Sequence, residues 1–197
     1  MKNTLSQPIC QNFKAALLLS LVLALVSSSS SNAQEAAAPN NAVGAARQYF
    51  QYLVKGEYDQ VPKAFHPEAV DEFSTLLQPL FDAPKETGDA MMSIFFEGLE
   101  PAEARKLSQA DRFARFISGM QRRFLTGVPQ LADSYKNAKY LGELPEGDLR
   151  HVLIRLKVGP NETFEHLIFK KEGDTWKMLL TPKVKTSLRQ VKAAVGG

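Results

Sequence analysis

The side chains best suited to acid–base or metal chemistry are three histidines, His66, His151 and His166. Imidazole titrates near neutral pH and is a common zinc ligand. A zinc site needs two or three such ligands with a carboxylate, typically at His-x-His or His-x-x-x-His spacing, and neither spacing occurs here. We therefore predict no metal site, with His166 half-buried in a sheet and His151 solvated. Pairing of their strands would nevertheless bring the two rings close together.

Motifs for nucleophilic catalysis are absent from the sequence. It contains no Gly-x-Ser-x-Gly, no phosphate-binding glycine-rich loop, and one cysteine, Cys10, close to the N-terminus. These absences remove the enzyme classes that carry such motifs and leave open an enzyme without one. We assign no catalytic residue and no cofactor.

Aromatic residues are plentiful in the predicted helices and strands. They could line an apolar ligand pocket between helices and sheet, or they could simply form the core, as aromatic stripes at helical spacing usually do. Both interpretations stay open. The residues that would line such a pocket are Tyr49, Tyr52, Phe113, Phe116, His166 and Trp176.

Basic residues gather on two predicted helices. Such faces contact an anionic lipid, a cell-wall polymer or an acidic partner, or they are merely solvated. The first group is Arg112, Arg115, Arg122 and Arg123, and the second is Lys183, Lys185, Arg189 and Lys192.

The elements that must position these side chains are helical in the first half of the chain. Asn41 can cap a first helix that ends at Gly56, and Pro67 suits the first turn of another that Pro79 ends or kinks. Ser108 and Asp111 form a near capping box for a long amphipathic helix. The predicted helices cover residues 42–55, 59–65, 67–79, 89–99, 101–107 and 109–127, with a loop over 82–88.

In the second half of the chain, apolar and polar residues alternate as they do in strands, and short turn sequences separate these segments. Short turns between successive strands indicate an antiparallel sheet. Strands are predicted over residues 133–141, 149–158, 162–171 and 175–181, followed by a helix over 182–195. Helices followed by a strand meander predict an α+β fold, with N-terminal helices packed on a curved antiparallel sheet of about four strands and an added C-terminal helix.

The N-terminus has the composition of a secretory signal peptide. Lys2 and Lys14 precede a run of apolar residues over 15–26 that is too short to span a bilayer, and small residues at Ser31 and Ala33 suit cleavage near Ala33. We predict a signal peptide over residues 1–33, a flexible tether over 34–41 and one domain over 42–197. The protein would be exported, either to a periplasm or to the medium.

Cleavage would change the character of the chain. Of 24 basic residues it removes Lys2 and Lys14, which leaves 22 against 21 acidic residues and a net charge of +1. This balance does not favour nucleic acid. Cleavage also removes Cys10, so the remaining 164 residues must fold without a disulfide, and no membrane-spanning segment remains.

Two stretches resemble the nuclear transport factor 2-like superfamily, which has a cystatin-like cone fold. Residues 45–59, leading into 64–68, resemble the family's first helix, its break and its second helix, and residues 169–178 resemble its penultimate turn and tryptophan-bearing last strand. The family includes ketosteroid isomerases and many exported ligand-binding domains. Residues 70–127 are longer and more helical than the family pattern.

Three functional hypotheses follow from these observations. The first is a non-catalytic exported module that binds a small apolar ligand or another envelope protein. The second is a small isomerase- or hydrolase-like enzyme, which requires a buried carboxylate or histidine inside the cone and a hydrogen-bond donor opposite it. The third is a homodimer formed through the exposed sheet face.

Overall fold

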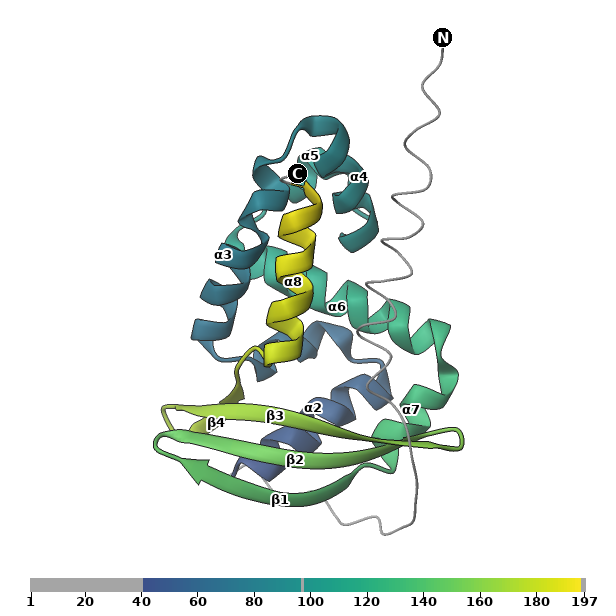
Figure 1. Ribbon diagram of the computed structural model, residues 1–197, viewed down its shortest axis with the longest axis vertical. Coiled ribbons are helices and arrows are strands. Elements are labelled where there is room, and N and C mark those ends of the chain that lie inside the picture. The colour runs from purple at the N-terminus through teal and green to yellow at the C-terminus, as the bar shows by residue number, and fades with distance from the viewer. Residues whose placement is uncertain (1–40, 97, 196–197) are drawn as a thin grey trace.

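The computed structural model describes residues 41–96 and 98–195. The predicted signal peptide over 1–33, and the predicted tether apart from Asn41, lie outside the described residues. The protein has the predicted α+β class, with helices followed by a four-stranded antiparallel open sheet and a C-terminal helix. In Figure 1, α2 and α7 lie along the sheet, and α3, α4, α5, α6 and α8 form a second helical group beyond it.

Helix α2 (Ala42–Lys55) begins and ends where the sequence predicts. The side-chain oxygen of Asn41 accepts a 2.7 Å hydrogen bond from the amide of Gly44. Gly56 ends the helix with a φ of 70°, a left-handed conformation that glycine adopts without steric cost. The short helix that follows is the 3₁₀ helix η1 (Tyr58–Ala64).

The prediction that Pro79 ends α3 is wrong, although a kink there is untested. Helix α3 (Pro67–Asp82) contains Pro79 in its last turn. A proline inside a helix costs about 3 kcal/mol through a lost hydrogen bond and a steric clash. The burial of Leu80 and the contact of the Phe81 ring with Phe96 hold this turn in place against that cost.

The predicted loop over 82–88 is also wrong, because α4 (Lys85–Phe95) begins before its glycine. Gly88 is buried inside the helix, and a Cβ atom there would lie 3.1 Å from the carbonyl oxygen of Leu80 and 2.9 Å from the Arg105 guanidinium. Gly88 therefore permits close packing and does not break the helix. The next turn, α5 (Pro101–Ala104), is shorter than predicted.

Helix α6 (Gln109–Gly127) is the predicted long amphipathic helix. The Ser108 hydroxyl accepts from the amide of Asp111 at 3.1 Å and donates to its carboxylate at 2.6 Å. The prediction of a strand over 133–141 is wrong for its first part. Residues 133–136 belong to α7 (Pro129–Lys136), because Pro129 occupies the first helical turn and starts a new helix, and residues 139–141 do lie in a strand.

The sheet is a meander in the order β1-β2-β3-β4. Strands β2 (Leu149–Val158) and β3 (Asn161–Glu172) form its long central pair, flanked by β1 (Lys139–Glu146) and the short β4 (Thr175–Met178). Strand β1 has an irregularity between Tyr140 and Gly142. The predicted turn over 144–148 is shorter than expected, because β1 continues through Pro145 to Glu146.

The two sheet faces differ in burial. The inner face, which the helices cover, carries Val152, Ile154, Leu156, Leu167 and Phe169, all buried. The outer face carries the alternate residues, and no described helix covers it (Figure 1). Its side chains from β2 and β3 are Leu149, His151, Leu153, Arg155, Lys157, Glu162, Phe164, His166, Ile168 and Lys170.

Helix α8 (Pro182–Val195) packs against α3 and confirms the predicted C-terminal helix. Leu188 and Val191 are each 2% exposed. At its N-terminal end the helix lies close to β3, because Lys183 forms an ion pair with Glu165 of that strand. The helix thereby connects the second helical group with the inner face of the sheet.

Candidate functional site

Glu165 is a carboxylate on the apolar inner face of the sheet. It opposes buried Ile154 on β2, and its same-face neighbours on β3, Thr163 and Leu167, are both buried. The Glu165 side chain is 25% exposed, so solvent still reaches it. A charged group in such a row costs stability unless partners compensate it, which makes Glu165 a candidate for function.

Polar side chains from four helices are linked to this carboxylate, Lys183 by an ion pair, Tyr49 and Tyr135 by electrostatic interaction, and Gln121 through Tyr49. The ammonium group of Lys183 on α8 is 3.7 Å from Oε1 of Glu165. Tyr49 on α2 is 8% exposed, and its hydroxyl accepts a 3.1 Å hydrogen bond from the amide of Gln121 on α6. Tyr135 on α7 stacks on Phe50, with ring centroids 4.9 Å apart. We call Tyr49, Gln121, Tyr135, Glu165 and Lys183 the inner polar cluster.

The electrostatics of the inner polar cluster favour neutral forms of its acids. Burial raises the pKa of the Glu165 carboxyl, and nearby Lys183 lowers it to a smaller extent. Burial also raises the pKa of the Tyr49 and Tyr135 hydroxyls, and the charge of Glu165 adds to both shifts. The two phenols are therefore protonated hydrogen-bond donors beside a carboxyl that holds its proton more tightly than usual.

Glu165 should make stability depend on pH. Because its pKa is higher in the folded than in the unfolded protein, its contribution to stability declines as the pH rises from about 4 through the folded pKa. We expect Glu165→Gln to match the parent near about pH 4 and to have the higher unfolding midpoint near about pH 7. Urea unfolding at the two pH values measures this. Glu57→Gln, at an exposed position, should show no such divergence.

The residues that the sequence suggested as pocket lining do not lie together. Tyr52 and Trp176 line one hollow of about 160 Å³ between α2, η1 and β4, together with Ala45, Gln48, Lys63, Ala64, Thr175 and Lys177. Phe113 and Phe116 are core residues that pack on Phe73. Tyr49 belongs to the inner polar cluster, and His166 lies on the outer face.

The structure places His66 apart from the other two histidines and brings His151 and His166 together, with Nδ1 of His151 2.8 Å from Nε2 of His166. It reverses the expected exposure of this pair. His66 caps α3, where its Nδ1 accepts from the amide of Glu68 at 3.2 Å. His166 is exposed because it lies on the outer face of the sheet. The His151 side chain is 18% exposed, since Glu146 of β1 lies against it. Within the described residues, no three His, Cys, Asp or Glu side chains are arranged to hold a metal ion.

Several basic residues of the two predicted patches have partners inside the protein. On α8, Lys183 pairs with Glu165, and Lys185 pairs with Glu72 of α3 at 2.7 Å. On α6, the Arg112 guanidinium lies 4.0 Å from the centre of the Phe81 ring. These side chains hold helices together, which reduces the charge free to meet an external anion.

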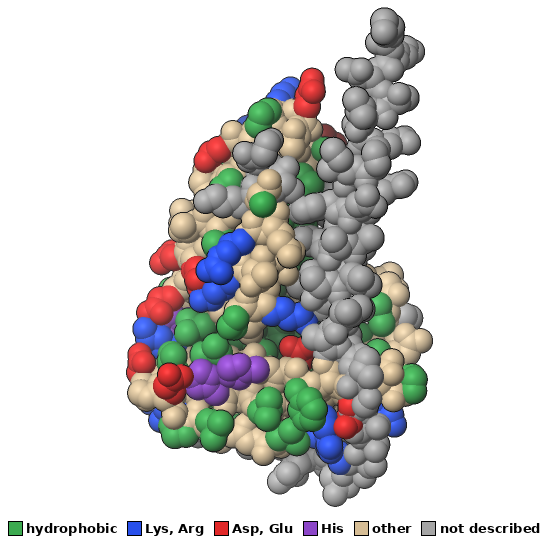
Figure 2. All heavy atoms as spheres, viewed as in Figure 1, with side chains coloured by type: hydrophobic (Ala, Val, Ile, Leu, Met, Phe, Trp, Pro, Cys, Tyr) green, Lys and Arg blue, Asp and Glu red, His purple; other side chains and the backbone are tan. Residues whose placement is uncertain are grey.

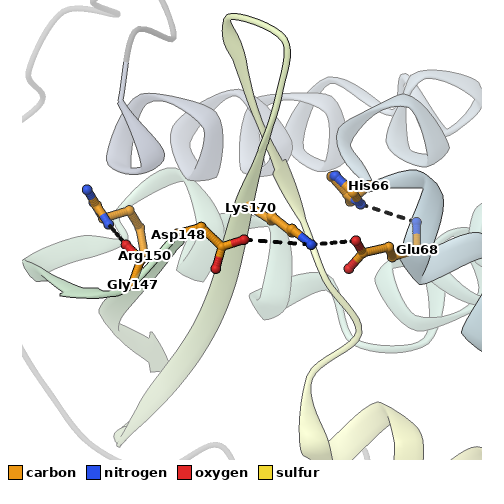
Figure 3. Close-up of polar contacts among 6 residues, drawn as sticks. All are labelled: His66, Glu68, Gly147, Asp148, Arg150 and Lys170. Carbon is orange, nitrogen blue, oxygen red and sulfur yellow. Dashed lines mark hydrogen bonds and ion pairs between the residues drawn. The ribbon is translucent and has the colours of Figure 1, made fainter.

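Lys170 joins the sheet to the second helical group. Figure 3 shows its ammonium group between the carboxylates of Glu68 and Asp148, at 2.5 and 3.7 Å. The hydrogen bond from Lys170 lowers the pKa of Glu68. The contact connects the start of α3 with β3 and the β1–β2 turn, so we assign it a structural role.

Sequence reasoning missed Glu165 although a signal was present. Residues 163, 165, 167 and 169 share one strand face, and three of them are Thr, Leu and Phe. The single acidic residue in this alternation, Glu165, therefore places a charged group on the buried side of the strand. The donors opposite it come from α2, α6 and α7, and their convergence depends on tertiary packing that spacing does not reveal.

None of the helices in the described ranges has the length and apolar character needed to cross a membrane. No protein-family model matches the chain, and no curated protein or solved structure is significantly similar to it.

Proposed function

We propose that the chain is an exported binding module for a small ligand that has an apolar body and a hydrogen-bonding head. The observation that supports this proposal is the inner polar cluster, in which four polar side chains from four helices are grouped with one partly exposed carboxylate. Glu165 would accept a hydrogen bond from the ligand head, and Tyr49 or Lys183 would donate one. Few polar groups among apolar walls are typical of small-molecule sites.

The apolar surroundings of the cluster support the same proposal. Phe50 contacts Tyr49 and Tyr135, with ring centroids 5.3 and 4.9 Å away, and Ile154 and Leu167 flank Glu165 on the sheet. Export rests on the leader-like N-terminus, and membership of the nuclear transport factor 2-like superfamily rests on the two stretches quoted above. Both remain part of the proposal.

We expect the full-length chain purified from its own host to retain a ligand visible by native mass spectrometry. Glu165→Gln should lower the occupied fraction at least about tenfold, because it removes a charged hydrogen-bond acceptor. The control is Glu162→Gln, the same change on the same strand but on the outer face. Equal occupancy in the parent and Glu165→Gln would contradict the proposal.

A second candidate function is acid–base catalysis by Glu165, which the raised pKa of its carboxyl favours. The half-buried carboxyl of Glu165, which interacts electrostatically with the hydroxyls of Tyr49 and Tyr135, supports this candidate. The same experiment separates the two functions. An enzyme should leave Glu165→Gln occupied by a substrate whose mass differs from that of any ligand on the parent. A binding module should leave this variant empty.

A further inference from the structure

The outer face of the sheet carries large apolar side chains, although a sheet face that meets water usually carries polar ones. Leu144 on β1 is 68% exposed, Leu153 on β2 40% and Phe164 on β3 57%. Elsewhere in the described ranges, only Val54 and Leu141 are large hydrophobic residues of comparable exposure. Figure 2 shows hydrophobic side chains gathered on this part of the surface beside the histidines. Apolar side chains that gather on one exposed face mark an interaction surface.

These three apolar side chains form a continuous row across the strands. The register places Leu144 and Phe164 each one step diagonal to Leu153. Diagonal neighbours on a sheet face lie about 7–8 Å apart, within reach of large side chains. The histidines beside the row satisfy each other, because Nδ1 of His151 lies 2.8 Å from Nε2 of His166 and one ring donates to the other. Covering the row therefore costs less than covering two unpaired imidazoles would.

The charges of the outer face are divided between its two ends. The end near the β2–β3 turn has three basic side chains against one acidic side chain, and the end near the β1–β2 turn has three acidic side chains against one basic side chain. The first group is Lys139, Arg155, Lys157 and Glu162, and the second is Glu68, Glu146, Asp148 and Lys170. At the second end, Lys177 and Glu172 offset each other at 3.9 Å. A face with opposite charges at its two ends is complementary to a second copy of itself turned end for end.

We propose that the protein forms a homodimer in which the outer faces of two copies pack against each other. The two copies are related by a two-fold axis that lies in the interface and crosses the strands, and the sheets lie about 10 Å apart, as stacked sheets do. Glu146 and Lys139 of β1 lie on either side of the middle of the face, opposite Leu149 and Arg155 of β2. The axis therefore places Glu146 of each copy against Lys139 of the other, which forms two symmetry-related ion pairs.

The same axis fits the apolar row to its own copy. Leu144 opposes His151 and Gly142 opposes Leu153, so both lie close to the middle of the face and on either side of it. The axis places Leu144 of one copy over Gly142 of the other. Apart from the chain neighbours of Gly142, no heavy atom lies within 4 Å of the position that a Cβ would take there. Gly142 therefore leaves room on the face for the leucine of the second copy.

The size of the outer face suits a weak dimer. Strand β2 has 10 residues in a sheet of four strands, and at about 3.3 Å per residue and about 4.8 Å per strand the face outlines about 600 Å². Two such faces bury about 1,200 Å², which is the lower end of standard interfaces, so we expect a dissociation constant of about 10–100 μM. Unfolding measured at about 1 μM then reports on the single chain. Glu165 points to the opposite face of β3, so the dimer and the inner polar cluster are independent.

Sedimentation velocity of the chain purified from its own host, over about 1–300 μM, tests the proposal. We expect the mass of the sedimenting species to double across this range. Leu153→Lys should stay monomeric throughout, because it brings two like charges together near the axis. Val54→Lys is the matched control, since Val54 is 37% exposed on α2, away from the sheet face. It should dimerise as the parent does.

Exchanging the charges of one ion pair tests the arrangement of the two copies. Glu146→Lys puts two lysines together and should weaken the dimer at least about tenfold. Adding Lys139→Glu restores opposite charges and should return the dissociation constant to within about threefold of the parent value. Circular dichroism checks that each variant is folded. A parent that stays monomeric at the highest concentration would overturn the proposal, and so would a dimer that Leu153→Lys leaves intact or that the double change does not restore.

Discussion

Replacing Phe113 with alanine is expected to lower the free energy of unfolding by about 3–5 kcal/mol. Phe113 on α6 is 1% exposed, and its ring meets those of Phe65 and Phe73 edge to face at 5.0 and 5.1 Å. These contacts join α6 to the η1–α3 connection and to α3. Alanine would leave a cavity among side chains from three elements, which cannot all move to fill it.

Urea or thermal unfolding followed by circular dichroism measures this loss. Phe164→Ala is the matched control, because it removes the same ring from the outer face, where Phe164 is 57% exposed. That change should alter stability by no more than about 0.5 kcal/mol. Similar losses for the two variants would show that the ring cluster around Phe113 does not form the core described above.

A chain that ends at Thr181 should lose about 3–6 kcal/mol of stability. Removing α8 deletes Leu188 and Val191, two fully buried side chains worth about 1.5–3 kcal/mol each. It also uncovers the face of α3 that α8 contacts and leaves Glu72 and Glu165 without their lysines. Unfolding of the truncated and full chains compares the two stabilities directly.

The control for the truncation is Arg189→Ser, which changes an exposed residue of α8 and should have an effect within about 0.5 kcal/mol. A truncated chain as stable as the full one would mean that α8 does not complete the core. The truncation is consequently unsuitable as a test of the basic face of α8, since a loss of partner binding would follow from unfolding. Arg189→Ser is the better test of that face.

Much of the fold could be predicted because local signals and tertiary packing agree. Asn41, Gly56 and Ser108 act within one turn of their own positions, so their roles can be recognised from the sequence alone. The alternation of Val152, Ile154 and Leu156 identified the central strand in the same way. Both signals are local, and the structure confirms both.

Two of the three errors occurred where a residue contacts side chains or backbone outside its own helical turn. Gly88 was interpreted as a loop residue, but it makes room for Leu80 and Arg105. Pro79 was expected to end or kink α3, and the ending is wrong, because packing of Leu80 and Phe81 carries the helix past it. Residues 133–136 were assigned to a strand, although Pro129 had already started a helix. In the first two cases tertiary contacts outweighed the local preference, and in the third a local signal, the proline at the start of α7, was overlooked.

The candidate site was harder to predict than the fold for a related reason. Tyr49 was named from the sequence for its aromatic surface, but its hydroxyl is what connects it to Gln121. The proximity of His151 and His166 was foreseen as a consequence of strand pairing, and the pairing of β2 with β3 brings it about. Glu146 could not be included, because its approach depends on the irregular register of β1.

The two edges of the open sheet have a consequence for aggregation. An unpaired strand edge is a template for another chain, and proteins limit this risk with proline, lysine, bulges or coverage. Strand β1 carries Pro145, which cannot donate a backbone hydrogen bond, and an irregularity after Tyr140. At the opposite edge, Met178 of β4 accepts a hydrogen bond from the amide of His66. Neither edge is a good template for fibril growth, although the sheet is open.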